Sequence, residues 1–388
     1  MKKHKHPVED REGFVLIVTG GGTGGHIYPA LAIAQEVKKR FKGAQVIFAG
    51  NPQGLEARVV PKEGITFAPI SSAGFPRSFS PKKIVFGFMA LVKGLKEALQ
   101  LIREKKPDAV VGTGGYVCFP VVLAAILRGV PTLLHESNLI PGVAVRLLAP
   151  FVKQVMVAFP QTRRKLWGKS IETGTPISPE ILTARRKNSY EAFGLDPSKF
   201  TVFVLGGSQG AHSINLAMVD ALFHLAEGKQ PPQVLFMTGY KDYQFVLDSC
   251  EKQALRAVVK PFLFNMPQAY AVADLVVCRA GAMTLAEVTA RGLPALLVPY
   301  PFAAHDHQRK NAQVLVRAGA AVMLADKELN GMLLSEHILG LIHDPEKYRT
   351  MAAASKAAGQ PEAGKKIFEE IGHAAGRSME FLNPGRAA

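Results

Sequence analysis

The feature that most constrains the fold is an alternation, repeated in both halves of the chain, of short apolar runs with longer segments of helical periodicity. Apolar runs of this kind are typical of parallel strands that are covered by helices on both faces of a sheet. In the first half the runs are Phe14–Val18, Gln45–Ala49, Ala109–Val111, Thr132–Leu134 and Val155–Ala158. In the second half they are Thr201–Leu205, Val234–Met237, Ala257–Val259, Leu275–Val277, Ala295–Val298 and Ala321–Leu324. The sequence therefore predicts an α/β protein with two doubly wound, Rossmann-like domains.

The two series are separated at Thr173–Pro179, where two prolines and one glycine interrupt both helix and strand. We expect a first domain over residues 1–178 and a second over residues 179–362. The remaining residues, 363–388, begin with the helix-like segment Ala363–Ala375. A chain of 388 residues suits two domains of ordinary size.

Positive charge is concentrated in the first half of the chain. Residues 1–180 hold 25 Lys and Arg against 12 Asp and Glu, a net charge of +13 out of the +16 of the whole chain. A charge that served solubility alone would be spread more evenly, so we expect the first half to meet an anionic partner. Nucleic acid, anionic lipid and a diphosphate-bearing substrate are the candidates.

Three glycine-rich turns directly follow predicted strands. Gly20–His26 precedes the helix-like stretch Pro29–Arg40, and we place Pro29 in the first turn of that helix. Gly206–Gly210 precedes a helix that should begin near His212, and the remaining turn is Gly112–Tyr116. Glycines let a ligand approach the backbone N–H groups at a helix N-terminus, where a phosphate is favoured. We expect the turns to open toward one crevice, because the carboxyl ends of parallel strands lie at the same edge.

Two familiar nucleotide motifs fit these turns poorly. Gly20, Gly22 and Gly25 match the dinucleotide fingerprint, but the second strand ends at Gly50-Asn51 without the acidic residue that would hold a ribose. The turn Gly206–Gly210 lacks the ending of a Walker loop, which disfavours ATP hydrolysis. A turn that only packs a helix on its sheet is the structural alternative to phosphate binding.

Further candidate residues follow other predicted strands. Glu287 lies on the helix after Cys278–Gly281, where a carboxylate can accept hydrogen bonds from two ribose hydroxyls; a solvated helix glutamate is the alternative. The segment Leu134–Pro141 presents His135, Glu136 and Asn138 together.

Metal binding is not expected. His305 and His307 lie on a polar loop, but no third ligand has suitable spacing nearby. An Asp-x-Asp pair, which would hold a divalent cation on a diphosphate, does not occur in the sequence. The three cysteines, Cys118, Cys250 and Cys278, show no CxxC spacing, which predicts free thiols in a reducing compartment.

The segment Gly74–Lys96 mixes aromatic and basic residues. It is either an ordinary amphipathic helix of the core or a patch for a membrane surface, where apolar side chains insert and cations meet anionic lipid. The residues concerned are Phe75, Phe79, Ile84, Phe86, Phe88, Arg77, Lys82, Lys83, Lys93 and Lys96.

Taken together, the motifs resemble those of the MurG family of bacterial N-acetylglucosaminyltransferases, which complete lipid II for peptidoglycan. The matching strings occur in the family's order and cover most of residues 14–320; they are GGTGGHIYPALAIA, GTGGYVCFPVVLAA, LLHESNLIPG, VLGGSQGA, NMPQAYAVADLVVCRAGAMTLAE and GLPALLVPYPFAAHDHQRKNA. The resemblance implies a GT-B glycosyltransferase fold, with two Rossmann-like domains facing across a cleft and the final helix returning to the first domain.

The resemblance also implies an activity and a place in the cell. The first domain would bind a lipid-linked N-acetylmuramyl-pentapeptide diphosphate, and the second would bind UDP-N-acetylglucosamine, with inversion at the anomeric carbon on transfer. The protein would work as a peripheral protein on the anionic cytoplasmic face of the bacterial inner membrane, with other cell-wall synthesis proteins as further partners. No cofactor would be required.

Site residues follow from the same resemblance. His26 would be the general base or a contact to the acceptor phosphate, and Tyr116, His135 and Glu136 would lie on the acceptor side. The donor contacts would be Thr23, Gly24, Gly25, Asn138, Ser208, Leu263, Ala282, Met283, Thr284, Leu285, Ala286, Glu287 and Gln308. One departure concerns the linker, where the family carries an arginine that contacts the donor and this chain has Ser178. Arg185 and Arg186 are the nearby candidates to replace that arginine.

Other classes of protein account for part of the pattern. A non-hydrolysing UDP-sugar epimerase shares the architecture and is the main alternative, since it would use a UDP-sugar without a lipid acceptor. A nucleic-acid-binding protein would explain the charge but not the glycine-rich turns, and the sequence lacks an RNA-binding aromatic signature. We therefore expect no nucleic-acid partner. A dehydrogenase is disfavoured by the missing carboxylate after the second strand.

Overall fold

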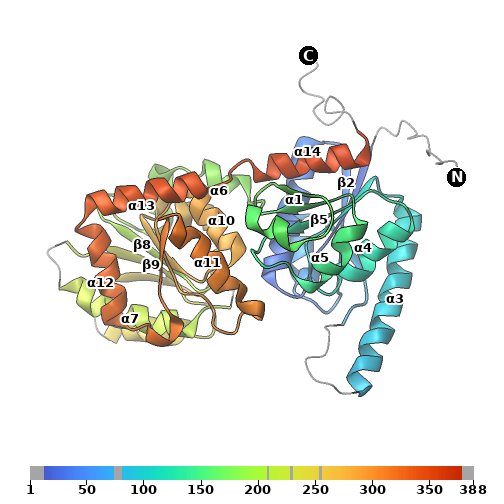
Figure 1. The fold of residues 1–388 in the computed structure, drawn as a ribbon. Coiled ribbons are helices and arrows are strands. Elements are labelled where there is room, and N and C mark those ends of the chain that lie inside the picture. The colour runs from blue at the N-terminus through green and yellow to red at the C-terminus, as the bar shows by residue number, and fades with distance from the viewer. Residues whose placement is uncertain (1–12, 74–80, 208, 228–229, 253–255, 378–388) are drawn as a thin grey trace, which may run out of the picture. The chain divides into compact units, whose positions relative to one another are not determined.

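Two groups of residues, each built around its own sheet, make up the described chain (Figure 1). The computed structural model describes residues 13–73, 81–207, 209–227, 230–252 and 256–377, and for residues 81–84 it describes the backbone only. Unit 1 comprises residues up to 137, residues 141–174 and residues from 362 onward. Unit 2 comprises residues 138–140 and 175–361.

The sheet of unit 1 is parallel throughout and has the strand order β3-β2-β1-β4-β5-β6-β7. In the register of β1, Phe14 pairs with Ala44 on one side and Leu16 pairs with Ala109 on the other. The order therefore reverses between β1 and β4, which is where doubly wound sheets bind their ligands. The strands are β1 (Phe14–Thr19), β2 (Ala44–Gly50), β3 (Thr66–Pro69), β4 (Ala109–Gly112), β5 (Thr132–Glu136), β6 (Gln154–Val157) and β7 (Ser170–Glu172).

Helices cover both faces of this sheet, and the alternation of side chains along β1 explains why. Leu16 and Val18 pack toward α1 and α14, whereas Ile17 packs toward α3 and α4 on the opposite face. Both faces are thus apolar, as a buried parallel sheet requires. The helices are α1 (Gly24–Arg40), α2 (Glu56–Val59), α3 (Pro81–Lys105), α4 (Cys118–Leu127), α5 (Val143–Leu148) and α14 (Ala363–Ala375), with 3₁₀ turns at Val60–Glu63, Ala149–Phe151 and Pro160–Lys165.

Helix α14 comes from the end of the chain and packs on unit 1. Its apolar residues Ile367, Phe368 and Ile371 are buried in the same core as α1. Polar contacts fasten it as well, because Lys153 Nζ donates to Ala374 O over 2.6 Å. Just beyond the helix, Arg377 forms an ion pair of 3.2 Å with Asp108. Unit 1 is therefore closed by residues that lie more than two hundred positions after its first strands.

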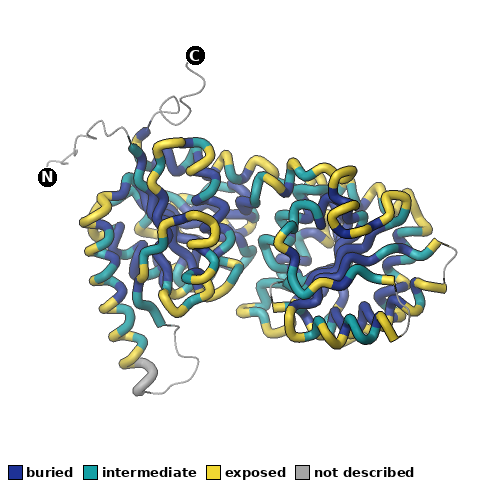
Figure 2. Tube along the Cα trace, turned by 180° about the vertical axis from the view of Figure 1, so that it is seen from behind, coloured by how far each residue is buried: buried dark blue, intermediate teal, exposed yellow. Residues whose placement is uncertain are grey.

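Unit 2 repeats the plan with a second parallel sheet, in the order β10-β9-β8-β11-β12-β13. Alternate residues of its central strand β8 again face opposite helical layers, with Phe203 and Leu205 toward α9 and α10, and Val202 and Val204 toward α7 and α12. Figure 2 shows both sheets as buried layers beneath more exposed helices. The strands are β8 (Thr201–Leu205), β9 (Gln233–Met237), β10 (Ala257–Lys260), β11 (Leu275–Cys278), β12 (Ala295–Leu297) and β13 (Ala321–Met323).

The helices of unit 2 follow its strands in the same manner as in unit 1. They are α6 (Pro179–Thr183), α7 (His212–Ala226), α8 (Tyr243–Lys252), α9 (Met266–Val272), α10 (Ala282–Arg291), α11 (His307–Arg317), α12 (Gly331–Ile342) and α13 (Pro345–Ala358). Short 3₁₀ turns lie at Arg186–Asn188, Glu191–Phe193, Ala304–Asp306 and Asp326–Glu328. The predicted fold class of two Rossmann-like sheets is confirmed; that the two face each other across a cleft stays a prediction.

Candidate active site

In unit 1, two of the glycine-rich turns touch through their backbones. They follow the adjacent strands β1 and β4, and Gly21 N donates to Gly114 O over 3.3 Å. A Cβ at Gly20 would collide with the Thr113 side chain, and one at Gly115, where φ is +84°, would collide with Gly21 O. Glycine is therefore required at these positions by close approach of the two turns.

Helix α1 begins earlier than the sequence predicts. It starts at Gly24 with Thr23 as N-cap, so Pro29 lies inside the helix and its predicted first-turn position is wrong. Pro29 is buried and has no N–H to donate to the preceding turn, yet the helix continues to Arg40. No side chain caps the helix start, and Thr23 and Gly25 are exposed. The first-turn N–H groups of α1 are thus placed to receive an anion, as the glycine pattern suggests.

His26 lies in the first turn of α1 and is hydrogen-bonded to Thr113 of the Gly112–Tyr116 turn. Its ring Nδ1 lies 2.9 Å from Thr113 O, and in return Thr113 Oγ1 donates to His26 O over 2.7 Å. Because a carbonyl only accepts, Nδ1 carries the proton in this bond, which leaves the lone pair of a neutral ring on Nε2. The geometry therefore fixes the orientation and the tautomer of His26.

The three residues expected on the acceptor side have different surroundings. Tyr116 is 44% exposed and its ring lies near Gly22. His135 and Glu136, at the end of β5, are fully buried. His135 Nε2 bonds to Gly174 O over 2.8 Å, and burial lowers the pKa of this imidazole to about 4 despite that bond. Glu136 Oε2 accepts from Gly142 N over 2.8 Å. Burial favours a positioning role for both residues.

In unit 2, the turn Gly206–Gly210 repeats the arrangement, with Gly210 at a φ of +76° and packed against Gly239. Helix α7 begins at His212, as predicted, without a side-chain cap. Ser208, the predicted diphosphate contact, lies outside the described residues. The first-turn N–H groups of α7 thus occupy the same position relative to their sheet as those of α1 do in unit 1.

A His–Asp pair next to this turn was missed by the sequence reasoning. His212 Nδ1 lies 3.1 Å from both carboxylate oxygens of Asp242. The buried side chain of Asn215 fixes Asp242 in turn, donating over 2.8 Å to Oδ2. Since 30 residues separate His212 from Asp242, no local pattern could reveal the pair.

Helix α10 carries the longest run of predicted donor contacts, Ala282 to Glu287, and it too starts without a side-chain cap. The side chain of Leu285 is buried in the core, so only its backbone is available to a ligand. Glu287 lies in the second turn and accepts a 2.7 Å hydrogen bond from the hydroxyl of Tyr270. Burial raises the pKa of Glu287 to about 7, an effect that the Tyr270 bond partly opposes. A carboxylate that titrates near neutral pH thus lies one turn after the start of α10.

Two further predicted donor contacts of this unit are Leu263, on a loop, and Gln308, in the first turn of a helix. Leu263 is buried, and its sequence neighbours Phe262 and Phe264 meet edge to face with ring centroids 5.0 Å apart. Gln308, on α11, accepts from Tyr300 N over 2.9 Å through Oε1. The turn just before α11 includes His305 and Asp306, both at positive φ, a conformation that is rare for residues other than glycine.

Asn138 is held by unit 2 although it follows a strand of unit 1. Asn311 of α11, which is fully buried, donates through Nδ2 to Asn138 Oδ1 over 3.1 Å. Asn311 Oδ1 accepts from Leu139 N over 3.0 Å. Asn311 therefore fixes this short segment at both its side chain and its backbone.

The structure narrows the choice of a cation to replace the linker arginine. Arg186 is engaged by Asp274, with Nη2 2.7 Å from Oδ1, and by the hydroxyl of Tyr190 over 2.6 Å. Its role is therefore to hold the start of unit 2 together, which leaves Arg185, an exposed residue, as the other candidate. Ser178 itself donates to Glu180.

Two observations concern metals and thiols. Among the described residues, no group of three or more His, Cys, Asp and Glu side chains is placed to hold a metal ion. The three cysteines are free and buried, and burial raises the pKa of the Cys118 thiol to about 12. These thiols are therefore unreactive core residues at neutral pH.

Comparison with known proteins follows the division into two units. Residues 16–157 match the model of the glycosyltransferase family 28 N-terminal domain, and residues 201–367 match that of the C-terminal domain. A Desulfitobacterium hafniense protein named UDP-N-acetylglucosamine–N-acetylmuramyl-(pentapeptide) pyrophosphoryl-undecaprenol N-acetylglucosamine transferase is 46% identical over 365 residues, covering 91% of this chain and 97% of its own.

Solved structures agree on the architecture. The crystal structure of Acinetobacter baumannii MurG superposes with a TM-score of 0.74 at 30% identity, covering 93% of this chain and 99% of its own. A UDP-GlcNAc 2-epimerase from Neisseria meningitidis reaches a TM-score of 0.65, covering 92% and 99%, but at 15% identity it shows similarity of fold alone.

Proposed function

The chain belongs to the family of UDP-N-acetylglucosamine–N-acetylmuramyl-(pentapeptide) pyrophosphoryl-undecaprenol N-acetylglucosamine transferases, and we propose that it transfers N-acetylglucosamine from UDP-N-acetylglucosamine to a lipid-linked N-acetylmuramyl-pentapeptide diphosphate, forming lipid II. The observation that carries the proposal is 46% identity over 91% of the chain, because a match of that extent includes residues of both units.

The donor is assigned to unit 2. Glu287 accepts hydrogen bonds from the ribose hydroxyls, and Tyr270 holds its carboxylate in place. The diphosphate lies at the uncapped start of α7, beside the turn Gly206–Gly210, where the helix dipole and backbone N–H groups stabilise the charge on the leaving UDP. Ser208 and the first turn of α10 complete this subsite in the proposal.

The acceptor is assigned to unit 1. Its diphosphate meets the exposed start of α1 at Thr23–Gly25, near His26 and Tyr116. In the reaction, an oxygen of the acceptor sugar forms a bond to the anomeric carbon of N-acetylglucosamine while the bond from that carbon to UDP breaks on the opposite face. The transition state is oxocarbenium-like and the configuration inverts.

His26 receives the hydroxyl proton of the acceptor in this mechanism. Its Nδ1 bond to Thr113 O presents Nε2 as the basic atom, and a histidine base suits proton transfer near neutral pH. Contact to the acceptor phosphate is the other role that the same position allows, and in that case the proton passes to solvent. The two roles affect different kinetic parameters.

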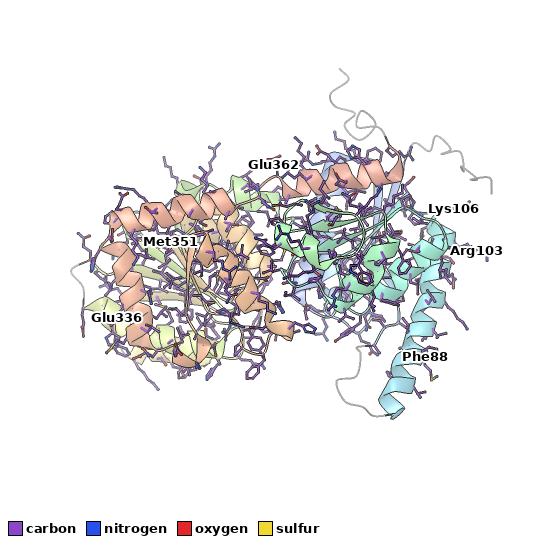
Figure 3. All side chains as sticks on the ribbon, in the orientation of Figure 1. Phe88, Arg103, Lys106, Glu336, Met351 and Glu362 are labelled. Atoms are coloured by element: carbon purple, nitrogen blue, oxygen red, sulfur yellow. The ribbon has the colours of Figure 1, made fainter. Side chains whose placement is uncertain are left out.

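We place the protein on the anionic cytoplasmic face of the membrane through α3. The described part of this helix nearest its start exposes apolar side chains, with Phe86 69% and Phe88 65% exposed, and Figure 3 shows Phe88 on the part of α3 that projects beyond the other helices of unit 1. Lys93 and Lys96, farther along α3, are exposed too. Phe75, Phe79 and Arg77 lie outside the described residues, as do the side chains of Lys82, Lys83 and Ile84. In the described residues, no helix is both long and apolar enough to span a bilayer.

Transfer of radiolabel tests the function directly. The protein is incubated with UDP-N-acetylglucosamine labelled in the sugar, with and without a lipid-linked N-acetylmuramyl-pentapeptide diphosphate. Label in the lipid product supports the transferase. Conversion of the donor alone, without acceptor, would support the epimerase alternative instead.

A further inference from the structure

A buried carboxylate that the proposed mechanism does not use lies in unit 1. Glu56, the first residue of α2, is fully buried. Its Oε1 accepts from Asn51 N over 3.1 Å, but its Oε2 is buried without a hydrogen-bond partner in the described part of the chain. A carboxylate oxygen that is removed from water and left unmatched is destabilising. Such a group is expected to have a partner, and the described residues do not supply one.

Glu56 is surrounded by glycine backbone and has no charged side chain paired with it among the described residues. A Cβ at Gly21, Gly50 or Gly54 would collide with the Glu56 side chain, so three glycine positions close around it. No Lys, Arg or His of the described residues forms an ion pair with this carboxylate. Glu56 is therefore enclosed directly beside the Gly20–Gly25 turn without a compensating cation.

Glu56 also lines a small pocket at the carboxyl edge of the unit 1 sheet. Polar groups of the pocket come from the ends of neighbouring strands, and exposed Tyr116 is part of its lining. The Asn51 side chain is already engaged, with Nδ2 donating to Ser72 O over 2.9 Å and Oδ1 accepting from Gln53 N over 2.9 Å. The lining residues of this Glu56 pocket are Gly22, Asn51, Gly54, Glu56, Ser72, Tyr116 and Val117.

The chemistry of the pocket selects the class of ligand. A phosphate is excluded by repulsion from the carboxylate. A divalent cation would need several oxygen ligands, and the described residues offer no cluster of three acidic, His or Cys side chains anywhere. A neutral N–H or O–H group satisfies one carboxylate oxygen without either requirement.

We propose that the Glu56 pocket receives an uncharged hydrogen-bond donor of the acceptor sugar. This donor is the acetamido N–H or a hydroxyl that does not attack the anomeric carbon, and Glu56 Oε2 is the accepting atom. The proposal rests on the transferase function above. The sugar and its diphosphate are then held by different parts of one turn, the sugar at the Gly21–Gly22 corner and the diphosphate at the start of α1. Because Oε2 is buried, binding of this donor requires a small movement of the pocket lining, which includes Gly22 and Gly54.

Glu56→Gln tests the assignment because it keeps the size of the side chain and an oxygen for Asn51 N, but replaces the unmatched oxygen by a donor. We expect the Kd of a short-chain lipid-linked N-acetylmuramyl-pentapeptide diphosphate, measured calorimetrically without UDP-sugar, to rise about tenfold. The acceptor KM should rise in parallel, with the KM for UDP-N-acetylglucosamine unchanged.

Glu97→Gln is the matched control. Both Glu97 oxygens are already occupied by Ser71, whose N and Oγ lie 2.6 and 3.0 Å away. This variant should bind the acceptor within twofold of the parent protein. A Glu56→Gln protein that folds, as judged by thermal unfolding, and binds the acceptor as well as the Glu97→Gln protein does would overturn the proposal.

A second measurement removes the dependence on folding of the variant. The parent protein is titrated with acceptors in which the acetamido N–H, or a hydroxyl that does not attack the anomeric carbon, has been removed one at a time. One of these acceptors should bind about tenfold more weakly, and equal binding of all of them would contradict the pocket's role. If the parent protein transfers no sugar at all, the transferase function fails; if transfer occurs but these differences are absent, only the Glu56 assignment fails.

Discussion

The hydroxyl of Tyr270 donates a 2.7 Å hydrogen bond to Oε2 of Glu287. Tyr270 is fully buried under the β8 sheet, where its ring meets Phe203 edge to face at 5.4 Å, so the hydroxyl has one fixed position. Burial and the neighbouring carboxylate raise the pKa of this phenol well above its usual value. Tyr270 therefore stays protonated and can only steady the carboxylate that we assign to the donor ribose.

Replacing Tyr270 by Phe removes this bond and keeps the ring. We expect the KM for UDP-N-acetylglucosamine to rise roughly fivefold at pH 7, the equivalent of about 1 kcal/mol, with kcat nearly unchanged. Tyr190→Phe is the control, because the Tyr190 hydroxyl bonds to Arg186 instead. Equal effects of both changes on donor KM would show that Tyr270 has only a general structural role.

The raised pKa of Glu287 predicts how donor binding depends on pH. With a pKa of about 7, Glu287 is largely protonated at pH 6 and ionised at pH 8. Because ribose hydroxyls are better held by the ionised form, donor affinity should increase as the pH rises through 7. Calorimetry of UDP-N-acetylglucosamine in two buffers at pH 6 should detect release of up to about one proton on binding. A Glu287→Gln protein that releases the same number of protons would contradict this assignment.

Glu287 should also make the stability of the fold depend on pH, in the direction opposite to that of donor affinity. The folded-state pKa of about 7 lies above the ordinary glutamate value of 4.5. Its contribution is therefore fully present below pH 4.5 and is lost as the pH rises through 7, because the folded state must then ionise a partly buried carboxylate. Donor affinity and the free energy of unfolding should therefore change in opposite directions near neutral pH. The same apparent pKa in both pH profiles would identify Glu287 as the titrating group.

His26 should control the chemical step. If it accepts the hydroxyl proton, His26→Ala lowers kcat by a factor of about 10²–10⁴ and leaves acceptor KM within a few-fold of the parent value. Steady-state kinetics with varied acceptor separates the two parameters. A large rise in acceptor KM with kcat preserved would instead identify His26 as a phosphate contact.

Membrane binding should depend on the exposed half of α3. Changing Phe86 and Phe88 together to Asp is expected to lower binding to anionic phospholipid vesicles at least tenfold, because two apolar side chains no longer insert and negative charge is added. Co-sedimentation measures the loss. Phe245→Asp, at an exposed position on α8 of unit 2, serves as the control and should bind normally. Equal loss in the control would point to a general effect of charge.

Much of the fold follows from local pattern, and the parts that were missed have a physical reason. Every strand predicted from an apolar run is present. The two that were not predicted, β3 and β7, are the edge strands of unit 1, and both are partly exposed. An edge strand needs no continuous apolar run, since one of its sides has no neighbouring strand. The early start of α1 was missed because Gly24 and Gly25 are poor helix formers in sequence terms.

The candidate site is less visible in the sequence than the fold. Glycine-rich turns and the position of Glu287 can be recognised because strand, turn and helix are contiguous. Glu56, His212 with Asp242, and Asn311 acquire their surroundings only when distant segments meet. No carboxylate stands at Gly50-Asn51, where a dinucleotide-binding protein would have one. Glu56 follows a few residues later, however, and is buried beside the Gly20–Gly25 turn.

Transfer of labelled N-acetylglucosamine from UDP to a lipid-linked N-acetylmuramyl-pentapeptide diphosphate is the decisive test of the transferase function. We expect label in the lipid product only when the acceptor is present. We also expect an excess of EDTA to leave the rate unchanged, because helix N-termini and backbone N–H groups stabilise the leaving UDP in this mechanism. Failure to label the lipid would contradict the transferase function, and loss of transfer in EDTA would contradict the metal-free mechanism.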